Sequence, residues 1–128
     1  MVKRMSNADI IACVNGITEI QEREKKEKCN ILGTKIKTFY TVTKNKQAML
    51  ELLKPYNESL ATLIKECKVV IDKGEIVVEG EYKERFNKSL KELQSIVLDV
   101  PIATMTMDDI DGSSLTLTEF GYISFMIE

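Results

Sequence analysis

Three aspartates close together, Asp108, Asp109 and Asp111, have the side chains that a hard cation prefers as ligands. Counted from Asp108, the twelfth residue is Glu119, as in a calcium-binding EF-hand loop. However, Ile110 stands at the third position, where a ligand is required, and the turn glycine of the sixth position is missing. The sequence therefore predicts a solvated turn here and no metal site.

A second acidic group, formed by Asp72, Glu75, Glu79 and Glu81, could supply a pair of carboxylates for acid–base catalysis. These residues surround a segment that resembles a β-hairpin. Charged residues at hairpin turns and edges commonly keep the strands soluble and prevent edge-to-edge pairing. We therefore interpret them as a solvated surface.

The chain contains no histidine, which is the commonest general base and the commonest ligand of transition metals. Its three cysteines, Cys13, Cys29 and Cys67, are scattered and form no CxxC pair, which is typical of reduced thiols in an intracellular protein. The glycine-rich motifs of nucleotide-binding loops and nucleophile elbows are also missing. We expect no catalytic residue, no metal and no cofactor, and therefore no enzyme.

Positive charge is concentrated in the first part of the chain. Residues 1 to 54 carry eleven Lys and Arg against six Asp and Glu, whereas residues 69 to 128 carry five against twelve. Three of the lysines, Lys35, Lys37 and Lys44, are candidates for contacting phosphate. In the charged stretch from Glu22 to Lys28 the charges alternate in sign and no aromatic residue is interleaved as a stacking platform, so a nucleic-acid partner is not expected.

The element that dominates the sequence is a long apolar stripe from Phe39 to Cys67 with alternating steps of three and four residues. Pro55 lies inside it and removes one helical hydrogen bond without shifting the phase. The pattern predicts one long helix kinked at Pro55, or two nearly collinear helices. The stripe either packs inside the domain or forms a seam with a partner, and its candidate interaction residues are Phe39, Val42, Met49, Leu53, Tyr56 and Leu60.

A shorter helix is expected before this stripe, capped by Ser6 or Asn7 and ending between Glu22 and Lys28. The stripe's own helix should begin between Cys29 and Thr34. After the stripe, two β-branched runs around Asp72 to Glu75 predict a hairpin.

Three further elements are expected in the last third of the chain. A third amphipathic helix should begin at Glu81, and a third strand over Val100 to Met107 could cover the hairpin. Thr116 and Glu119 match a capping box, which predicts a last short helix from Leu117 to Ile127 that either fills the core or docks on another subunit.

The sequence thus predicts an α+β fold in one domain, residues 1–128. It is mainly helical, with the long central helix, a small antiparallel hairpin or three-stranded sheet, and a short C-terminal helix. No apolar run approaches the roughly 20 residues that cross a bilayer, so no membrane association is expected.

The order of these elements, together with the segments YTVTKN (Tyr40 to Asn45), Glu84 to Leu93 and Phe125 to Glu128, resembles a family of small uncharacterised proteins encoded by phages and prophages of Gram-positive bacteria. The resemblance implies a location in the cytoplasm of the bacterial host cell. It brings no functional residues with it.

Three functions are compatible with these observations. The first is a non-enzymatic phage or prophage accessory protein that acts through protein–protein interaction and self-association, through the long helix or the C-terminal helix. The second is a small-ligand binder that takes up a nucleotide signal of the host and so counters its defence. The third is a minor component of virion assembly.

Overall fold

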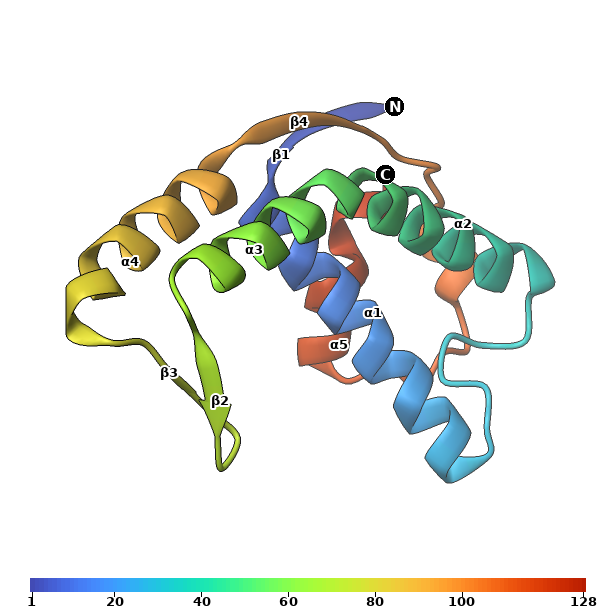
Figure 1. Cartoon of the computed structure of the whole chain (residues 1–128). Coiled ribbons are helices and arrows are strands. Elements are labelled where there is room, and N and C mark those ends of the chain that lie inside the picture. Colours follow the sequence, from blue (N-terminus) through green and yellow to red (C-terminus); the bar gives the residue numbers. More distant parts are fainter.

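Helix α1 (Asn7–Glu27) contacts four other elements in the computed structural model, which describes all 128 residues (Figure 1). The fold is α+β and largely helical. The other elements, in chain order, are β1 (Val2–Ser6), α2 (Ile36–Leu52), α3 (Lys54–Glu66), β2 (Val70–Asp72), β3 (Glu75–Val77), α4 (Gly80–Ser95), β4 (Val97–Pro101), the 3-10 helix η1 (Met107–Ile110), α5 (Leu117–Ile123) and the 3-10 helix η2 (Ser124–Met126).

Helix α1 forms where the sequence predicts it. The hydroxyl of Ser6 accepts a hydrogen bond from the N–H of Asp9, and the carboxylate of Asp9 accepts one from the N–H of Ser6, which satisfies two free donors of the first turn. The helix ends at Glu27, and Lys28 adopts a left-handed conformation. One face of the helix is buried: Ile10, Val14, Ile17 and Ile20 all lie in the core.

The first correction concerns the third strand. Residues 97 to 101, rather than Val100 to Met107, form β4, and β4 pairs with the N-terminal strand β1 rather than with the hairpin. The pairing is antiparallel and runs from Val2 opposite Pro101 to Ser6 opposite Val97. Local periodicity could not reveal this ribbon, because about 95 residues separate its partners and β1 shows no clear alternation of apolar and polar residues.

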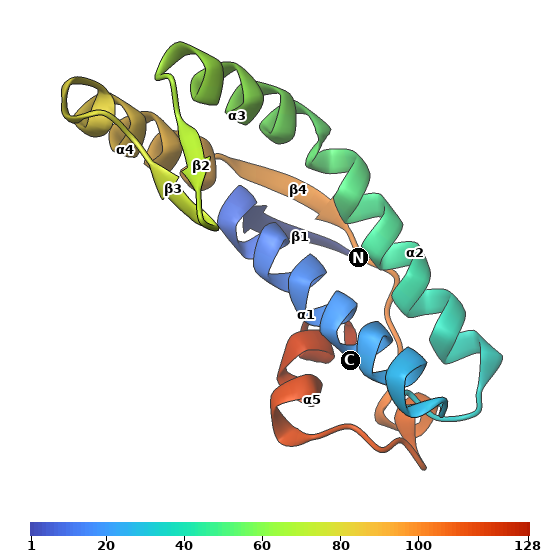
Figure 2. The same ribbon diagram turned by 60° about the horizontal axis from the view of Figure 1, so that its bottom comes forward.

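The single long central helix is not confirmed. Two helices, α2 and α3, follow each other and are joined at Leu53, with a bend between them that is visible in Figure 1 and foreshortened in Figure 2. Pro55 lies in the first turn of α3, where the missing N–H of proline is tolerated. The start of α2 is also later than predicted, at Ile36, because Gly33 adopts a positive φ of 102° and the chain stays irregular until Lys35.

The predicted hairpin is present as β2 and β3. Lys73 and Gly74, both with positive φ, form its two-residue turn. Positive φ at both turn residues gives the backbone a twist that matches that of the flanking strands, which favours a hairpin. The third amphipathic helix is α4, and it packs beside α3. Leu63 of α3, Cys67 directly after α3, and Phe86 of α4 form a small apolar cluster that is separate from the main core.

The C-terminal segment fills the main core. Thr116 and Glu119 form the predicted capping box at the start of α5. The helix ends at Ile123, earlier than predicted, and η2 continues the segment. Ile123 and Met126 are completely buried. Of the two roles expected for this segment, packing inside the chain is therefore the one observed.

No helix of the structure combines the length and the apolar character that crossing a membrane would require.

Candidate functional site

The predicted stripe residues are mainly core residues. Val42, Met49, Leu53 and Tyr56 are buried in the main cluster, together with residues of α1 and of the C-terminal segment. Of the two interpretations of the stripe, intramolecular packing is the one that this burial supports. Leu60 is half-buried against the same cluster, and Phe39 is 51% exposed. A partner of the folded chain could therefore reach Phe39 but not the four buried residues.

The three candidate phosphate ligands differ in their surroundings. Lys35 precedes α2, and its ammonium group donates a hydrogen bond of 2.6 Å to the carbonyl of Asp108. The backbone N–H of Thr106 lowers the pKa of Asp109, and the charges of Lys37 and Lys35 lower it further. Lys35 and Lys37 thus face acidic η1, while Lys44 is exposed farther along α2.

The candidate metal-binding aspartates lie in a helix cap, and two of the candidate catalytic carboxylates lie beside the hairpin turn. The aspartates of η1 belong to a capping box in which the N–H of Thr106 donates to the carboxylate of Asp109 at 2.9 Å. The structure contains no group of three or more Cys, Asp or Glu side chains arranged to hold a metal ion. Asp72 and Glu75 lie opposite each other next to the hairpin turn, and both are exposed.

The three cysteines are free. Cys67 is buried in the small cluster, Cys13 is half-buried and Cys29 is exposed. Burial raises the pKa of the Cys13 thiol, and the nearby carboxylate of Asp9 raises it further, so Cys13 is a poorer nucleophile than an ordinary cysteine.

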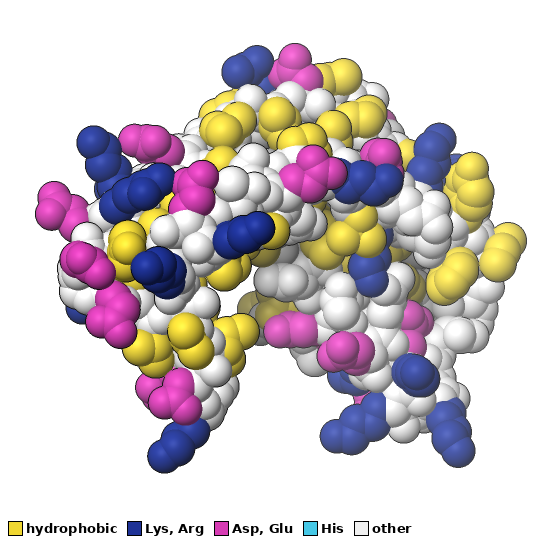
Figure 3. Space-filling view, in the orientation of Figure 1, with side chains coloured by type: hydrophobic (Ala, Val, Ile, Leu, Met, Phe, Trp, Pro, Cys, Tyr) yellow, Lys and Arg dark blue, Asp and Glu magenta, His cyan; other side chains and the backbone are white.

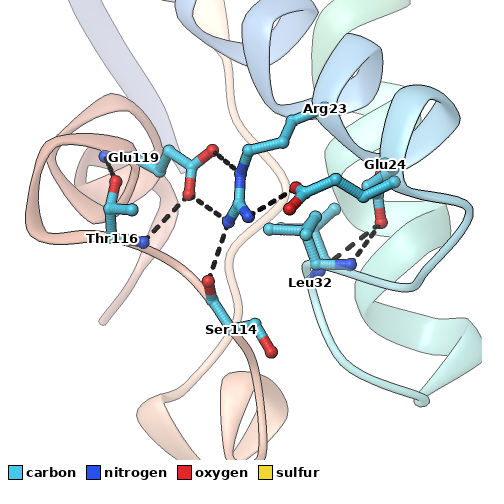
Figure 4. Close-up of polar contacts among 8 residues, drawn as sticks. Arg23, Glu24, Leu32, Ser114, Thr116 and Glu119 are labelled. Carbon is cyan, nitrogen blue, oxygen red and sulfur yellow. Dashed lines mark hydrogen bonds and ion pairs between the residues drawn. The ribbon is translucent and has the colours of Figure 1, made fainter.

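A polar cluster centred on Arg23 joins α1 to α5 (Figure 4). Arg23 donates from Nε to Oε2 of Glu119 at 2.7 Å and from Nη2 to Oε1 of Glu119 at 2.6 Å. It also donates to the carbonyl of Ser114 and to the carboxylate of Glu27, both at 2.8 Å. The hydrogen bonds from Arg23 lower the pKa of Glu119 and raise that of Arg23 itself. Both carboxylate oxygens of Glu119 accept hydrogen bonds from Arg23, and Oε1 also accepts one from the N–H of Thr116, so the cluster fixes α5 in place.

Sequence reasoning missed this pair, because no local signal connects residues that are 96 positions apart. The capping-box motif did identify Glu119 as a residue with a defined role.

The hairpin carries four exposed apolar residues. Val70, Ile71, Ile76 and Val77 are exposed by 60, 75, 66 and 46%, respectively. The hairpin projects from the α3–α4 pair, and apolar side chains gather on this projection (Figures 1 and 3).

An apolar groove of about 590 Å³ lies between the hairpin and the helices α3 and α4. One of its ten lining residues, Gln94, is polar, and none is charged. The nine apolar ones are Tyr56, Leu60, Ile64, Val69, Val70, Ile71, Ile76, Phe86 and Leu90. A groove of this composition can bind an apolar surface but cannot catalyse proton transfer, because it contains no group that ionises near neutral pH.

The hairpin is apolar on both of its faces. Ile71 and Ile76 lie opposite each other on one face, and Val70 and Val77 lie opposite each other on the other. Strands with one wet face alternate apolar and polar residues, whereas continuous apolar runs are typical of strands buried on both faces. Here both faces are exposed. In the sequence this uninterrupted apolar pattern is the signal of an additional binding surface, beyond the hairpin that it predicts.

Comparison of the chain with protein-family models, with curated proteins and with solved structures finds no match in any of the three.

Proposed function

We propose that this chain is a non-enzymatic interaction protein that self-associates, burying the β2–β3 hairpin and the adjoining groove against a second copy of the chain. The observation that carries the proposal is the exposure of a hairpin whose sequence is that of a strand pair covered on both faces. Removing apolar area from water stabilises an assembly by about 25 cal/mol per Å². Burying the exposed apolar side chains of the hairpin would supply that free energy.

The stability of the hairpin supports the same proposal. A two-stranded hairpin is marginally stable in water unless it packs against other elements. Val69 and Val78, at its base, pack on the small cluster of α3 and α4, but the six strand residues are exposed. A partner that covers them would supply the missing packing.

The charges around the hairpin favour a second copy over an acidic or basic partner. Lys73 lies in the turn, Glu75 follows it and Glu79 follows the second strand. A surface that carries both signs at its margin can complement itself, whereas a partner of one charge would meet like charges. An isologous contact between identical surfaces is the commonest arrangement of soluble oligomers.

The biological setting that we propose follows the resemblance to small phage and prophage proteins. The protein would act as an accessory protein in the cytoplasm of the bacterial host cell, with the dimer as its active form.

The test is the molar mass of the chain in solution, measured by light scattering over a range of concentrations. The wild type should change from 14.5 kDa to twice that mass as its concentration rises. The double variant Ile71→Thr and Ile76→Thr should stay at the mass of one chain, because threonine keeps a high strand propensity but removes apolar area.

The matched control is Ile36→Thr, which makes the same change at an exposed isoleucine of α2 far from the hairpin in the sequence. It should dimerise like the wild type. A wild type that remains at 14.5 kDa at every concentration would overturn self-association. If the hairpin binds a different protein and never a second copy of the chain, self-association is equally overturned.

A further inference from the structure

The two strands of the hairpin offer different edges to a partner. In an antiparallel pair, opposite residues alternate between those that exchange hydrogen bonds and those that do not. The two-residue turn at Lys73 and Gly74 makes Asp72 and Glu75 the bonded pair next to it. Ile71 and Ile76 are then the next, non-bonded pair. Their backbone N–H and C=O groups point outward, toward the two free edges.

The edge of β2 is partly occupied. Along the free edge of β2, the next residue whose backbone groups point outward is Val69. Its N–H donates a hydrogen bond of 3.0 Å to the carbonyl of Ile64 in α3. On the other edge, the corresponding residue after β3 is Val78, and no backbone hydrogen bond ties Val78 to the rest of the chain. The edge of β3 is therefore the more open one.

We infer that two copies pair through their β3 edges, antiparallel and around a two-fold axis at Ile76, so that the two hairpins form one four-stranded sheet. This inference rests on the proposed self-association and specifies its geometry. Each Ile76 would exchange two backbone hydrogen bonds with Ile76 of the other copy. The next bonded pair on either side would join Val78 of one copy to Gly74 of the other.

Side-chain chemistry agrees with this register. Glu75 would lie opposite Val77 of the other copy, so that the two Glu75 carboxylates are not opposed. Glu79 would lie beside the turn of the other copy, within reach of the long side chain of Lys73, and the symmetry makes this contact twice. A register centred on Ile71 of β2 gives no such pair, because it places Lys73 beside Val69.

The apolar faces of the two hairpins also agree with this register. Pairing at Ile76 aligns Ile71 and Ile76 of both copies on one face of the joined sheet, as four adjacent isoleucines. Ile71 and Ile76 both line the groove that the hairpin forms with α3 and α4, as does Val70. The groove would thus become continuous with that of the second copy.

Disulfide trapping tests the register. In a background with Cys13→Ser and Cys29→Ser, which removes the two accessible thiols and keeps buried Cys67, the variant Ile76→Cys is oxidised mildly. Bonded pairs place their Cα atoms about 5.5 Å apart, within the range of a disulfide. A covalent dimer on a non-reducing gel is the expected result.

The control is Val77→Cys in the same background. In the inferred register two Val77 residues are diagonal neighbours about 7–8 Å apart, beyond the usual span of a disulfide, so little covalent dimer should form. A chain that doubles its mass while Ile76→Cys fails to cross-link, or cross-links no better than Val77→Cys, would overturn the register and leave self-association standing. A chain that never doubles its mass would overturn both.

Charge reversal gives a second, independent measurement. Lys73→Glu and Glu79→Lys should each weaken dimerisation by about three- to tenfold, because each turns two attractive contacts into repulsive ones. The double variant should return to within about twofold of the wild type. Single variants that weaken dimerisation without recovery in the double variant would contradict the pairing of these two residues.

Discussion

Ile71 and Ile76 lie directly opposite each other across the β2–β3 hairpin, and both side chains are exposed. Cross-strand pairs of β-branched residues stabilise a sheet when they are packed against further side chains. This pair lies at the mouth of the groove formed with α3 and α4. Its exposure is the physical reason for proposing the hairpin, rather than the long helices, as the interaction surface.

Met49 should behave as a core residue, since it is completely buried in the main cluster. Met49→Ala should lower the free energy of unfolding by about 2–5 kcal/mol, because it removes apolar contacts and leaves a cavity. Chemical denaturation followed by circular dichroism measures this change.

Phe39→Ala, made on the exposed part of the same helix, is the control and should change stability by only about 0.5 kcal/mol. Equal small effects of the two substitutions would mean that α2 is not packed as described.

Gly16 permits the close contact of α1 with α5. A Cβ added at this glycine would lie 2.5 Å from Cγ of Tyr122, which is shorter than any ordinary carbon contact. Gly16→Ala should therefore destabilise the chain by about 1–3 kcal/mol, although alanine is otherwise preferred to glycine within a helix. The midpoint of thermal unfolding, with conversion to free energy, is the measurement.

Gly121→Ala is the matched control within α5. Nothing lies within 4 Å of a Cβ at this position, so the substitution should be neutral or stabilising by up to about 1 kcal/mol. A stabilised Gly16→Ala variant would show that the two helices do not approach each other at Tyr122.

The ion pair of Arg23 and Glu119 should make stability depend on acid pH. Hydrogen bonds from Arg23 hold the pKa of Glu119 below its ordinary value of 4.5. A carboxylate whose folded-state pKa is lowered contributes its stability above the unfolded-state pKa and loses it as the pH falls through the folded-state pKa. We therefore expect the melting temperature to fall below a pH of about 4.5, in part because of this residue.

Glu119→Gln removes the charge but keeps the shape. At neutral pH it should cost about 1–3 kcal/mol, because it weakens charged hydrogen bonds to a partly buried arginine. Its melting temperature should depend less on pH in the acid range than that of the wild type. An unchanged acid dependence would show that other carboxylates cause it.

Much of the fold follows from local patterns in the sequence. The cap of Ser6, the positive φ positions of the hairpin turn and the capping box of Thr116 are properties of neighbouring residues, and the structure has all three. The β1–β4 ribbon and the contact of Arg23 with Glu119 join residues from opposite ends of the chain. No local periodicity encodes such pairs.

The candidate site illustrates the same limit. The apolar stripe of Val42 and Met49 is equally compatible with a core and with an interface, since both bury the same side chains. Tertiary packing decides between them, and it places these two residues in the core. The hairpin was visible in the sequence, but its importance became clear only once the structure left Ile71 and Ile76 exposed.

The most direct test of the account is hydrogen exchange of the hairpin amides, residues 70 to 77, at low and at high protein concentration. If the hairpin is buried against a second copy, exchange in this segment should slow strongly as the concentration rises, while the amides of α1 exchange at an unchanged rate. Hairpin amides that exchange equally fast at all concentrations would contradict the central claim.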